Sequence, residues 1–557
     1  MKKRSTGVFI VIMALLFSLS LSGCGSSGGQ DSASGDQPND TKQQQKAGSD
    51  AGDSDTGSAG QEEPITINFA FYTTGAFDEK DTVAEKTIEE KFPGVDAVFW
   101  PVERDTWTQQ LATRIAGGDV PDYFQIFDRD SLVQQGILAE IPIEDIQTYM
   151  PGYYQGILEY GPDVLLATYY EGKNYGLPLL SYTNIYPFTA AYRQDWLTNV
   201  GIDKVPETLE EMEAAFRAFT FDDPDGNGKD DTIGYSPVGM GSAIFNVFSE
   251  IYAAYGVYPD KWMATEDGTF RPGVVTPKGK EVLSILQRWY QEGLIDKEFI
   301  TIDATTSNQK WANGVSGYMH HTWYRWIPGG ELSESLKAVN PDASFVLAPA
   351  PKGPNGDYGY DTWDRIGNSY GISAEAKEDT DKYHKLLQIV ETIGFQDLEL
   401  YQTLKFGIKG EHWNPDPETQ VPTFVEPYNL AENRGPLGTN EVLLVKPCST
   451  EFLWSEYGNL TDTFMIYNGK TSIVAGKDFV EWPGKLMDPD VTQMYQEDAN
   501  AALSKLIINI ITGTSSVDDF DALVADWENA GGAELIREFN RVYKENQDLV
   551  QEMLSLK

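Results

Sequence analysis

Between residues 65 and 127 the sequence alternates strand patterns with helix patterns, and this alternation constrains the fold more than any other feature. Apolar side chains recur at every second position in the strand segments and at every third or fourth position in the helical ones. The expected order is strand 65–71, a helix 78–92 capped by Asp78, strand 95–100, helix 107–116 and strand 123–127. Such alternation predicts a parallel, doubly wound sheet, which collects ligands at the carboxyl ends of its strands.

The length and the charge of the chain exclude several classes of protein. A chain of 557 residues is too long for one hydrophobic core, because cores stop growing near about 250–300 residues. The formal net charge of −43 weighs against nucleic-acid binding and against docking on anionic lipid, since both need a basic face. Only two cysteines occur, Cys24 and Cys448, so neither a disulfide framework nor a thiolate metal cluster is expected.

The first residues have the pattern of an export signal. Lys2, Lys3 and Arg4 precede an apolar run over 7–21, which is shorter than the roughly 20 residues of a membrane-spanning helix. Residues 21–24 read Leu-Ser-Gly-Cys and resemble the bacterial lipobox, in which the cysteine is acylated and becomes the new N-terminus. We therefore expect a signal peptide over 1–23 and a lipidated Cys24; an ordinary signal peptide with a chance cysteine is the alternative.

The segment that follows Cys24 has the composition of a tether. Residues 25–64 contain no Val, Ile, Leu, Met, Phe, Trp or Tyr, so they cannot bury enough apolar surface to fold. A flexible chain of this length reaches about 35 Å root-mean-square. The sequence predicts a lipidated, disordered tether over 24–64 that holds a globular part at the outer face of the cell membrane.

Six short motifs within the globular part together resemble a known family. In chain order they are 117–122 (GGDVPD), 172–178 (GKNYGLP), 192–197 (YRQDWL), 206–211 (PETLEE), 292–299 (EGLIDKEF) and 313–319 (NGVSGYM). Each motif is weak alone, but six in order over two hundred residues are specific. On these residues the chain resembles the extracellular solute-binding proteins of ABC importers, in the sugar-binding group (solute-binding protein family 1) and its long lipoprotein branch.

The resemblance implies a fold and a division into lobes. It implies a periplasmic-binding-protein-like α/β fold of type II, with two doubly wound lobes, a hinge, and a ligand cleft between the lobes. The chain is expected to cross between the lobes more than once. We place the N-terminal lobe at 65–187 and 343–400, and the C-terminal lobe at 188–342 and 401–557.

One acidic loop has the spacing of a calcium site. Oxygen-bearing side chains stand at loop positions 1, 3, 5 and 9, with a glycine at 6 and a backbone carbonyl at 7, as hard cations require. The predicted ligands of a structural Ca²⁺ are Asp223, Asp225, Asn227, the Lys229 carbonyl and Asp231. Position 12 is Gly234 where an EF-hand has a bidentate glutamate, so another oxygen must complete the shell. An empty Asp/Gly-rich turn is the alternative, and the resemblance favours calcium.

Aromatic and acidic side chains cluster where the cleft is expected. Sugar rings stack their C–H faces on aromatic rings and hydrogen-bond to polar side chains. The predicted substrate-binding residues are Tyr72, Asp128, Tyr182, Trp323, Tyr324 and Trp363. Each aromatic residue could equally belong to the core. Trp323 is the strongest candidate, because the resemblance places an aromatic residue after that strand on the cleft wall.

The resemblance implies a binding protein and not an enzyme. We expect a monomeric receptor that captures an oligosaccharide and delivers it to the transmembrane subunits of an ABC permease. Two alternatives remain open, a cell-surface glycoside hydrolase using two of the many carboxylates and a receptor for a non-sugar solute. The identity, length, linkage and charge of the sugar do not follow from the sequence.

Overall fold

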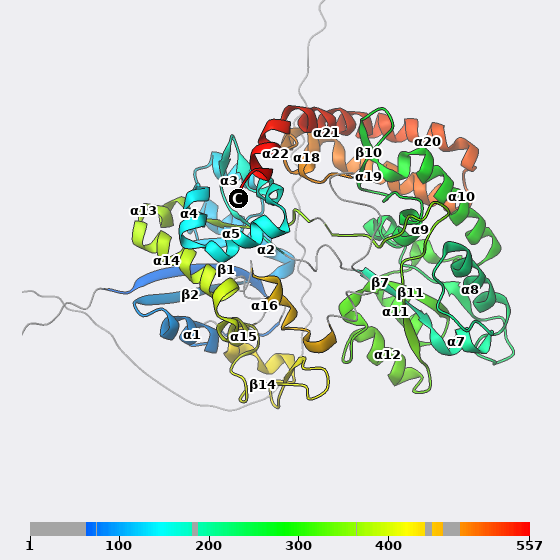
Figure 1. The fold of residues 1–557 in the computed structure, drawn as a ribbon, viewed down its shortest axis with the longest axis horizontal. Coiled ribbons are helices and arrows are strands. Elements are labelled where there is room, and N and C mark those ends of the chain that lie inside the picture. The colour runs from blue at the N-terminus through cyan, green and yellow to red at the C-terminus, as the bar shows by residue number, and fades with distance from the viewer. Residues whose placement is uncertain are drawn as a thin grey trace, which may run out of the picture. The chain divides into compact units, whose positions relative to one another are not determined.

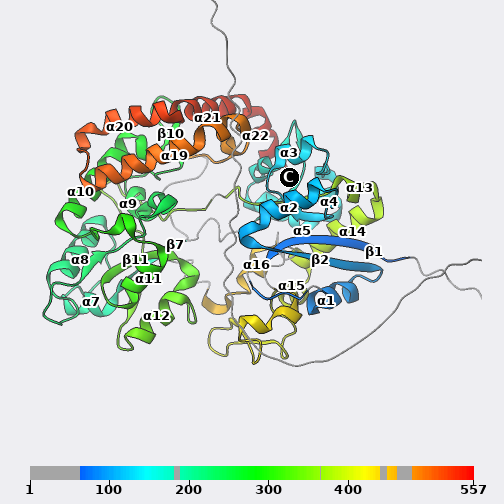
Figure 2. The same cartoon turned by 180° about the vertical axis from the view of Figure 1, so that it is seen from behind.

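The computed structural model describes residues 63–73, 75–78, 80–180, 188–363, 365–439, 448–460 and 479–557. The predicted signal peptide, Cys24, most of the tether and Tyr182 lie outside the described residues. Two sheets organise the described part (Figures 1 and 2).

The first sheet confirms the alternation predicted from the sequence. Its strand order is β2-β1-β3-β13-β6, and β1 is parallel to both of its neighbours. The strands are β1 Ile65–Thr73, β2 Val95–Glu103, β3 Tyr123–Gln125, β6 Leu177–Pro178 and β13 Ser369–Ile372. Strand β13 runs antiparallel to β3, because the chain re-enters this sheet from the opposite end. Ile67, Phe69 and Phe71 of β1 are buried, so the apolar side of the predicted alternation faces the core.

Local interactions fix the first helices. Helix α1 (Val83–Lys91) begins at Thr82, whose hydroxyl accepts a hydrogen bond from the Glu85 amide while the Glu85 carboxylate accepts one from the Thr82 amide. The cap is therefore Thr82 and not the predicted Asp78. Helix α2 (Trp107–Ala116) packs on β2 and ends at Gly117, at the first of the six motifs.

The motif at 117–122 has a structural role. The Asp122 carboxylate accepts hydrogen bonds from the Asn68 amide of β1 at 2.7 Å and from the Asn68 side chain at 3.0 Å. Lys382 of α14 (Thr380–Glu391) lies 3.2 Å from the same carboxylate. Asp122 is buried and so joins β1 to a helix from a distant part of the chain.

The second sheet belongs to the other lobe and has the order β12-β7-β11-β8. Strand β7 runs antiparallel to both β11 and β12, whereas β8 is parallel to β11. The strands are β7 Phe188–Arg193, β8 Ile233–Tyr235, β11 Ser316–Thr322 and β12 Phe345–Ala348. The α/β fold class is confirmed, and both sheets are mixed because crossing segments of the chain enter them from the opposite end.

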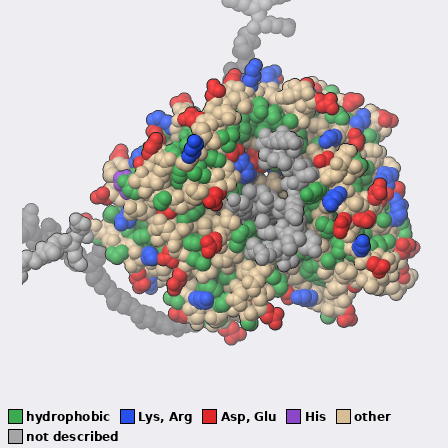
Figure 3. All heavy atoms as spheres, viewed as in Figure 1, with side chains coloured by type: hydrophobic (Ala, Val, Ile, Leu, Met, Phe, Trp, Pro, Cys, Tyr) green, Lys and Arg blue, Asp and Glu red, His purple; other side chains and the backbone are tan. Residues whose placement is uncertain are grey.

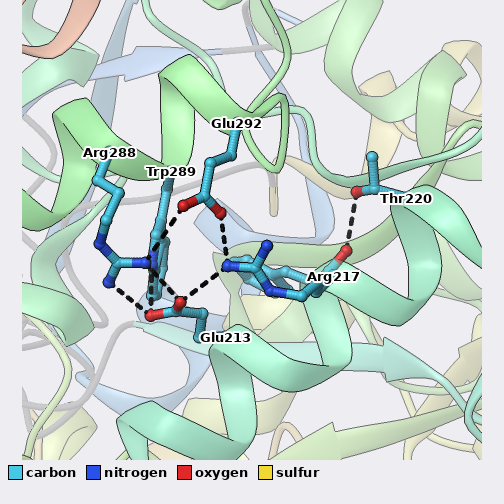
Figure 4. Close-up of polar contacts among 7 residues, drawn as sticks. Glu213, Arg217, Thr220, Arg288, Trp289 and Glu292 are labelled. Atoms are coloured by element: carbon cyan, nitrogen blue, oxygen red, sulfur yellow. Dashed lines mark hydrogen bonds and ion pairs between the residues drawn. The ribbon is translucent and has the colours of Figure 1, made fainter.

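Helices α8 (Leu209–Phe221) and α10 (Pro277–Glu292) form as the sequence predicts, and α8 packs on β8 and β11 of the second sheet. The capping box at Thr208 and Glu211 is present, and Gly293 ends α10 in a left-handed conformation. An ion-pair network joins the two helices, since Glu213 of α8 accepts hydrogen bonds from Arg288 and from the Trp289 indole at 2.8 Å (Figure 4). The Arg288 guanidinium lowers the pKa of Glu213 to about 2, so the network is ionised at neutral pH.

The structure assigns three segments differently from the expected lobe boundaries. Strand β12, expected in the first lobe, pairs with β7 in the second sheet. Helix α15 (Leu398–Phe406) packs on α1, and the Gly435 carbonyl accepts a hydrogen bond from the Asp78 amide at 3.0 Å, so these residues lie on the first lobe. Helix α22 (Gln547–Leu554) packs on the 3-10 helix Pro162–Ala167 of the first lobe. No local sequence pattern marks these returns, because they depend on long-range packing.

The other helices and strands complete the two lobes, and α19, α20 and α21 lie together at one end of the second lobe (Figures 1 and 2). The remaining helices are α3 Arg129–Gln134, α4 Ile143–Tyr149, α5 Pro151–Tyr160, α7 Gln194–Asn199, α9 Ser249–Ala253, α11 Ala304–Ala312, α12 Glu331–Val339, α13 Ala374–Glu378, α16 Thr450–Trp454, α18 Trp482–Lys485, α19 Pro489–Thr512, α20 Phe520–Trp527 and α21 Ala533–Glu545. The remaining strands are β4 Tyr169–Tyr170, β5 Lys173–Asn174, β9 Trp262–Ala264, β10 Phe270–Pro272, β14 Trp413–Pro415 and β15 Pro422–Phe424. On the face drawn in Figure 3, Asp and Glu side chains are spread over the surface instead of forming one patch.

Candidate functional site

The strand directions define one functional edge in each sheet. In the first sheet, β1, β3 and β6 end at the edge where β13 begins. In the second sheet, β8, β11 and β12 end at the edge where β7 begins. Two crossing segments connect these edges along the chain, 349–368 and 179–187, and 181–187 lie outside the described residues. Open α/β sheets collect ligands at such edges.

A buried arginine anchors the second crossing segment. The Arg365 amide lies 3.2 Å from both carboxylate oxygens of Glu481, and the Arg365 guanidinium forms an ion pair with Asp163 of the first lobe. The Tyr160 hydroxyl donates to the Arg365 carbonyl at 3.2 Å. Burial alone would lower the pKa of Arg365, but Asp163 and Glu481 raise it above its usual value. Arg365 thus holds the crossing segment by charge-assisted bonds to two distant parts of the chain, at Asp163 and Glu481.

Two buried carboxyl groups lie behind the strand ends of the second lobe. Asp361, in the crossing segment, accepts a hydrogen bond from the Asn246 side chain, and burial raises its pKa to about 7 although Lys261 opposes this shift. Glu250 of α9 accepts a hydrogen bond from the Tyr318 hydroxyl at 2.8 Å, and burial raises its pKa to about 8. Both groups lie near the functional edge with pKa values above those of ordinary acids.

An aromatic column lies at the junction of the crossing segments. Trp363 is 41% exposed and meets Phe188, the first residue of β7, edge-on at 5.9 Å. Phe188 in turn packs on His320 at 5.0 Å, and His320 stacks on Tyr360 at 5.7 Å. Burial lowers the pKa of His320 to about 3, so the imidazole is neutral and serves as part of the column. The exposed ring of Trp363 therefore rests on a rigid aromatic support.

The structure places Trp323 differently from the prediction that it lines the cleft wall. Its side chain is 2% exposed, and its ring lies 4.4 Å from that of Tyr457 and 6.3 Å from that of Trp454. The cause is the 3-10 helix Trp323–Arg325, which turns the chain after β11 and directs this ring into a hydrophobic cluster. This burial favours a core role for Trp323. The neighbouring Tyr324 is 40% exposed.

The predicted site residues of the first lobe already have local partners. Tyr72 packs edge-on against Trp107 at 6.2 Å, and the Arg104 guanidinium lies over its ring at 5.7 Å. Asp128 is exposed and caps α3, since its carboxylate accepts a hydrogen bond from the Ser131 amide at 3.2 Å. Both residues lie at the functional edge of the first sheet.

The acidic loop closes on itself around Asn227. The side-chain NH2 group of Asn227 donates hydrogen bonds to the Asp225 carboxylate at 2.7 Å and to the Asp231 carboxylate at 3.1 Å. The two Asp223 carboxylate oxygens accept hydrogen bonds from the Asn227 and Gly228 amides at 3.0 Å each. The loop carboxylates thus converge, but Asn227 lies between two of them. Within the described residues no three Asp, Glu, His or Cys side chains form a metal-binding group.

Gly234, at position 12 of this loop, is fixed by packing. A Cβ atom at this position would lie 2.7 Å from Cβ of Phe216 and 3.0 Å from the Leu294 carbonyl oxygen. A glutamate therefore cannot stand here, since the loop leads directly into β8 beneath α8. Any twelfth-position ligand must come from another part of the chain or from solvent.

A cavity of about 420 Å³ lies in the second lobe. Its walls come from the loop before β9, from α18 and from α19, and they include Asp260, Trp262, Glu481, Gln496 and Asn500. Sequence reasoning missed this cavity together with Glu250, Asp361 and the Arg365 cluster. None of these has a local motif, because each pairs residues far apart in the sequence.

No helix within the described part of the chain is long and apolar enough to cross a membrane.

Comparison with known proteins agrees with this architecture. The sequence model of the bacterial extracellular solute-binding proteins matches residues 73–388. Lipoprotein LipO of Bacillus subtilis is 24% identical over 468 residues, covering 82% of this chain and 88% of LipO. The polygalacturonan/rhamnogalacturonan-binding protein YtcQ of the same organism is 24% identical over 369 residues, covering 63% of this chain and 67% of YtcQ.

A third relative also has a solved structure. The fructooligosaccharide ABC transporter substrate-binding protein FusA of Streptococcus pneumoniae is 26% identical over 284 residues, or 48% of this chain and 49% of FusA. The structure of FusA with kestose superposes with a TM-score of 0.60 at 18% identity, and the superposition covers 87% of this chain and 99% of the chain in that structure, which shows a common fold. Because the family model matches more than half of the sequence, this chain belongs to the bacterial extracellular solute-binding protein family.

Proposed function

We propose that this chain is the substrate-binding subunit of an ABC importer, and that it captures an oligosaccharide between its lobes and delivers it to the permease. The observation that carries the proposal is the aromatic column at the junction of the crossing segments, where Trp363 presents an exposed ring beside buried acids. Aromatic rings with nearby polar groups are what sugar rings bind. YtcQ and FusA, which are both named for sugar polymers or oligomers, support the substrate class.

A ligand that contacts both lobes binds the closed form, in which the lobes lie together, more tightly than the open form. It therefore stabilises the closed form by this difference in affinity. We place Trp363 and Tyr324 in the site as exposed aromatic residues, with Tyr72, Asp128 and Tyr182 as further candidates from the strand ends. The chain is proposed to act as a monomer without catalytic activity.

A thermal-shift screen over an oligosaccharide panel tests this function, because a ligand bound only by the native state raises the melting temperature by mass action. We expect at least one sugar to raise it, with no reducing-sugar release. Turnover of a glycan would instead support the hydrolase alternative, and stabilisation by a non-sugar solute alone would reject the oligosaccharide.

We further propose that Cys24 is lipidated and anchors the chain at the outer face of the cell membrane. The likeness to LipO, which is named as a lipoprotein, supports this location. Stable anchoring takes two acyl chains, which a lipidated N-terminal cysteine supplies. Mass spectrometry of the purified native protein tests the modification.

We also propose that the acidic loop binds one structural Ca²⁺ ion. Asp223, Asp225, Asn227, the Lys229 carbonyl and Asp231 form an oxygen-rich donor set that suits a hard cation. In the described geometry the side-chain NH2 group of Asn227 donates hydrogen bonds to two of the carboxylates, those of Asp225 and Asp231. Binding therefore requires the Asn227 side chain to turn its oxygen inward, and a water or a distant oxygen replaces the missing twelfth ligand.

A further inference from the structure

An arginine stands at the functional edge of the first sheet, beside one of the predicted site residues. Strands β1 and β2 are parallel, and Thr73 at the end of β1 pairs with Glu103 at the end of β2. Arg104 follows directly, as the first residue of the 3-10 helix Arg104–Thr106. Arg104 therefore lies at the edge where the ligands of an open α/β sheet collect.

The aromatic ring of Tyr72 supports this arginine. The Arg104 guanidinium lies over the Tyr72 ring, 5.7 Å from its centroid. Trp107 is buried and packs edge-on against the same ring at 6.2 Å, so the turn from 104 to 107 contacts Tyr72 twice. A guanidinium that stacks on an aromatic ring keeps the N–H groups at its outer edge, and it is already oriented for a ligand that binds in its plane.

The Arg104 side chain has no acceptor in the described part of the chain. It is exposed, and it forms no ion pair and no hydrogen bond with any described residue, although Glu103 and Asp105 flank it in the sequence. Three other arginines near the functional edges are already paired with carboxylates: Arg129 with Asp130, Arg325 with Glu331, and Arg365 with Asp163. Among these four arginines, and with respect to the described residues, only Arg104 has all of its N–H donors left for a ligand.

A carboxylate is the ligand group that fits such a guanidinium best. Its two oxygens accept two parallel N–H bonds, and hydrogen bonds between charged partners are roughly twice as strong as neutral ones. Asp128, the acid predicted for the site, follows β3, and β1 lies between β3 and β2. With neighbouring strands about 4.8 Å apart, Arg104 and Asp128 leave the sheet roughly 10 Å from each other. A ligand carboxylate can therefore bind Arg104 without lying against Asp128.

We infer that Arg104, supported by Tyr72, binds the carboxylate of a uronic acid unit and thereby selects acidic oligosaccharides. The inference rests on the proposed function and narrows its substrate from sugars in general to those that contain uronic acid. Arg104 supplies the charge-assisted hydrogen bonds, and Tyr72 orients its guanidinium. Trp363 binds the face of a sugar ring, which uronic and neutral sugars share.

Calorimetric titration of the full chain tests this inference. The acidic probes are oligogalacturonates, oligomannuronates and oligoglucuronates, each compared with its own methyl ester, which has the same length and linkage but no charge. Neutral fructo-, manno-, xylo- and galacto-oligosaccharides complete the panel. We expect at least one acid to bind, and its methyl ester to bind about ten- to hundredfold more weakly, the loss typical of a hydrogen bond between charged groups.

The outcomes separate the inference from the proposed function. Binding of neutral sugars alone, or equal affinity for an acid and its methyl ester, overturns the inference but leaves the proposed function standing. Failure of every sugar in the panel overturns the proposed function and the inference with it.

Substitutions assign the selectivity to Arg104. Arg104→Gln should bind the acid and its methyl ester equally well, and Arg104→Lys should keep only part of the preference, because an ammonium group has no planar fork. Arg114→Gln is the matched control, since Arg114 also lies over an aromatic ring, that of Trp100 at 4.1 Å, but belongs to α2 and pairs with Asp119. Melting temperatures show which variants fold, and Arg104→Lys keeps the test informative if Arg104→Gln does not. A folded Arg104 variant that prefers the acid as strongly as the unsubstituted protein rejects the inference.

Discussion

Replacing Glu250 with glutamine should make the protein more stable at neutral and alkaline pH. Glu250 is fully buried, one carboxylate oxygen accepts a hydrogen bond from the Tyr318 hydroxyl at 2.8 Å, and the other has no hydrogen-bond partner among the described residues. Burial raises the pKa of this group from its ordinary value of 4.5 to about 8. Glutamine keeps the acceptor for Tyr318 and cannot ionise.

The sign of the effect follows from proton linkage. Between pH 4.5 and 8 the folded protein holds a proton on Glu250 and the unfolded chain does not. The free energy of unfolding therefore falls as the pH rises, by about 1.4 kcal/mol per unit. At pH 7 the loss amounts to about 3 kcal/mol, and Glu250→Gln avoids it.

Urea unfolding at pH 5, 6, 7 and 8 measures the effect. The difference in unfolding free energy between Glu250→Gln and the unsubstituted protein should grow by about 1.4 kcal/mol for each pH unit. Glu281→Gln, at an exposed glutamate of α10, controls for the loss of one negative charge. A difference that stays constant across this pH range would refute the reasoning, whatever its size at one pH.

Four further predictions concern single residues. Trp323→Ala should lower the unfolding free energy by about 3–5 kcal/mol, because it leaves a cavity in the core. An unchanged melting temperature would contradict the core role and support the predicted position of Trp323 on the cleft wall. Trp363→Ala should weaken sugar binding about tenfold in calorimetry and leave the melting temperature unchanged, since the Trp363 ring is exposed. A variant that binds the sugar as tightly as the unsubstituted protein would show that Trp363 is not part of the binding site. Calcium should raise the melting temperature of chelator-treated protein but not that of Asp225→Ala, and an equal rise in both would place the ion elsewhere. Cys24→Ala should release a folded protein from the membrane fraction, and its retention there would contradict lipid anchoring.

The sequence predicted those parts of the fold that have local causes. The alternation from 65 to 127, the capping box at Thr208 and the apolar stripe of α10 all depend on neighbours within a few residues, and all are present. The position of Trp323 was predicted incorrectly as cleft wall, because a single 3-10 turn redirected its ring toward residues more than a hundred positions away.

The buried polar groups could not be predicted for a related reason. Asp361 meets Asn246, and Arg365 meets Asp163 and Glu481, only after the chain has crossed between the lobes. No periodicity or motif in the sequence indicates which residues form such long-range pairs. Gly234 is the opposite case. The sequence shows that it replaces the glutamate of an EF-hand loop, and the structure explains the replacement by close packing against Phe216.

Small-angle X-ray scattering, with and without a sugar from the oligosaccharide panel, tests the central claim most directly. The claim is that an oligosaccharide binds between the lobes and closes them, so a sugar that binds in calorimetry should reduce the radius of gyration of the protein. A sugar from the same panel that does not bind is the matched control at equal concentration. Tight binding with an unchanged radius of gyration would contradict the account, since the ligand would then make no contact that favours the closed form.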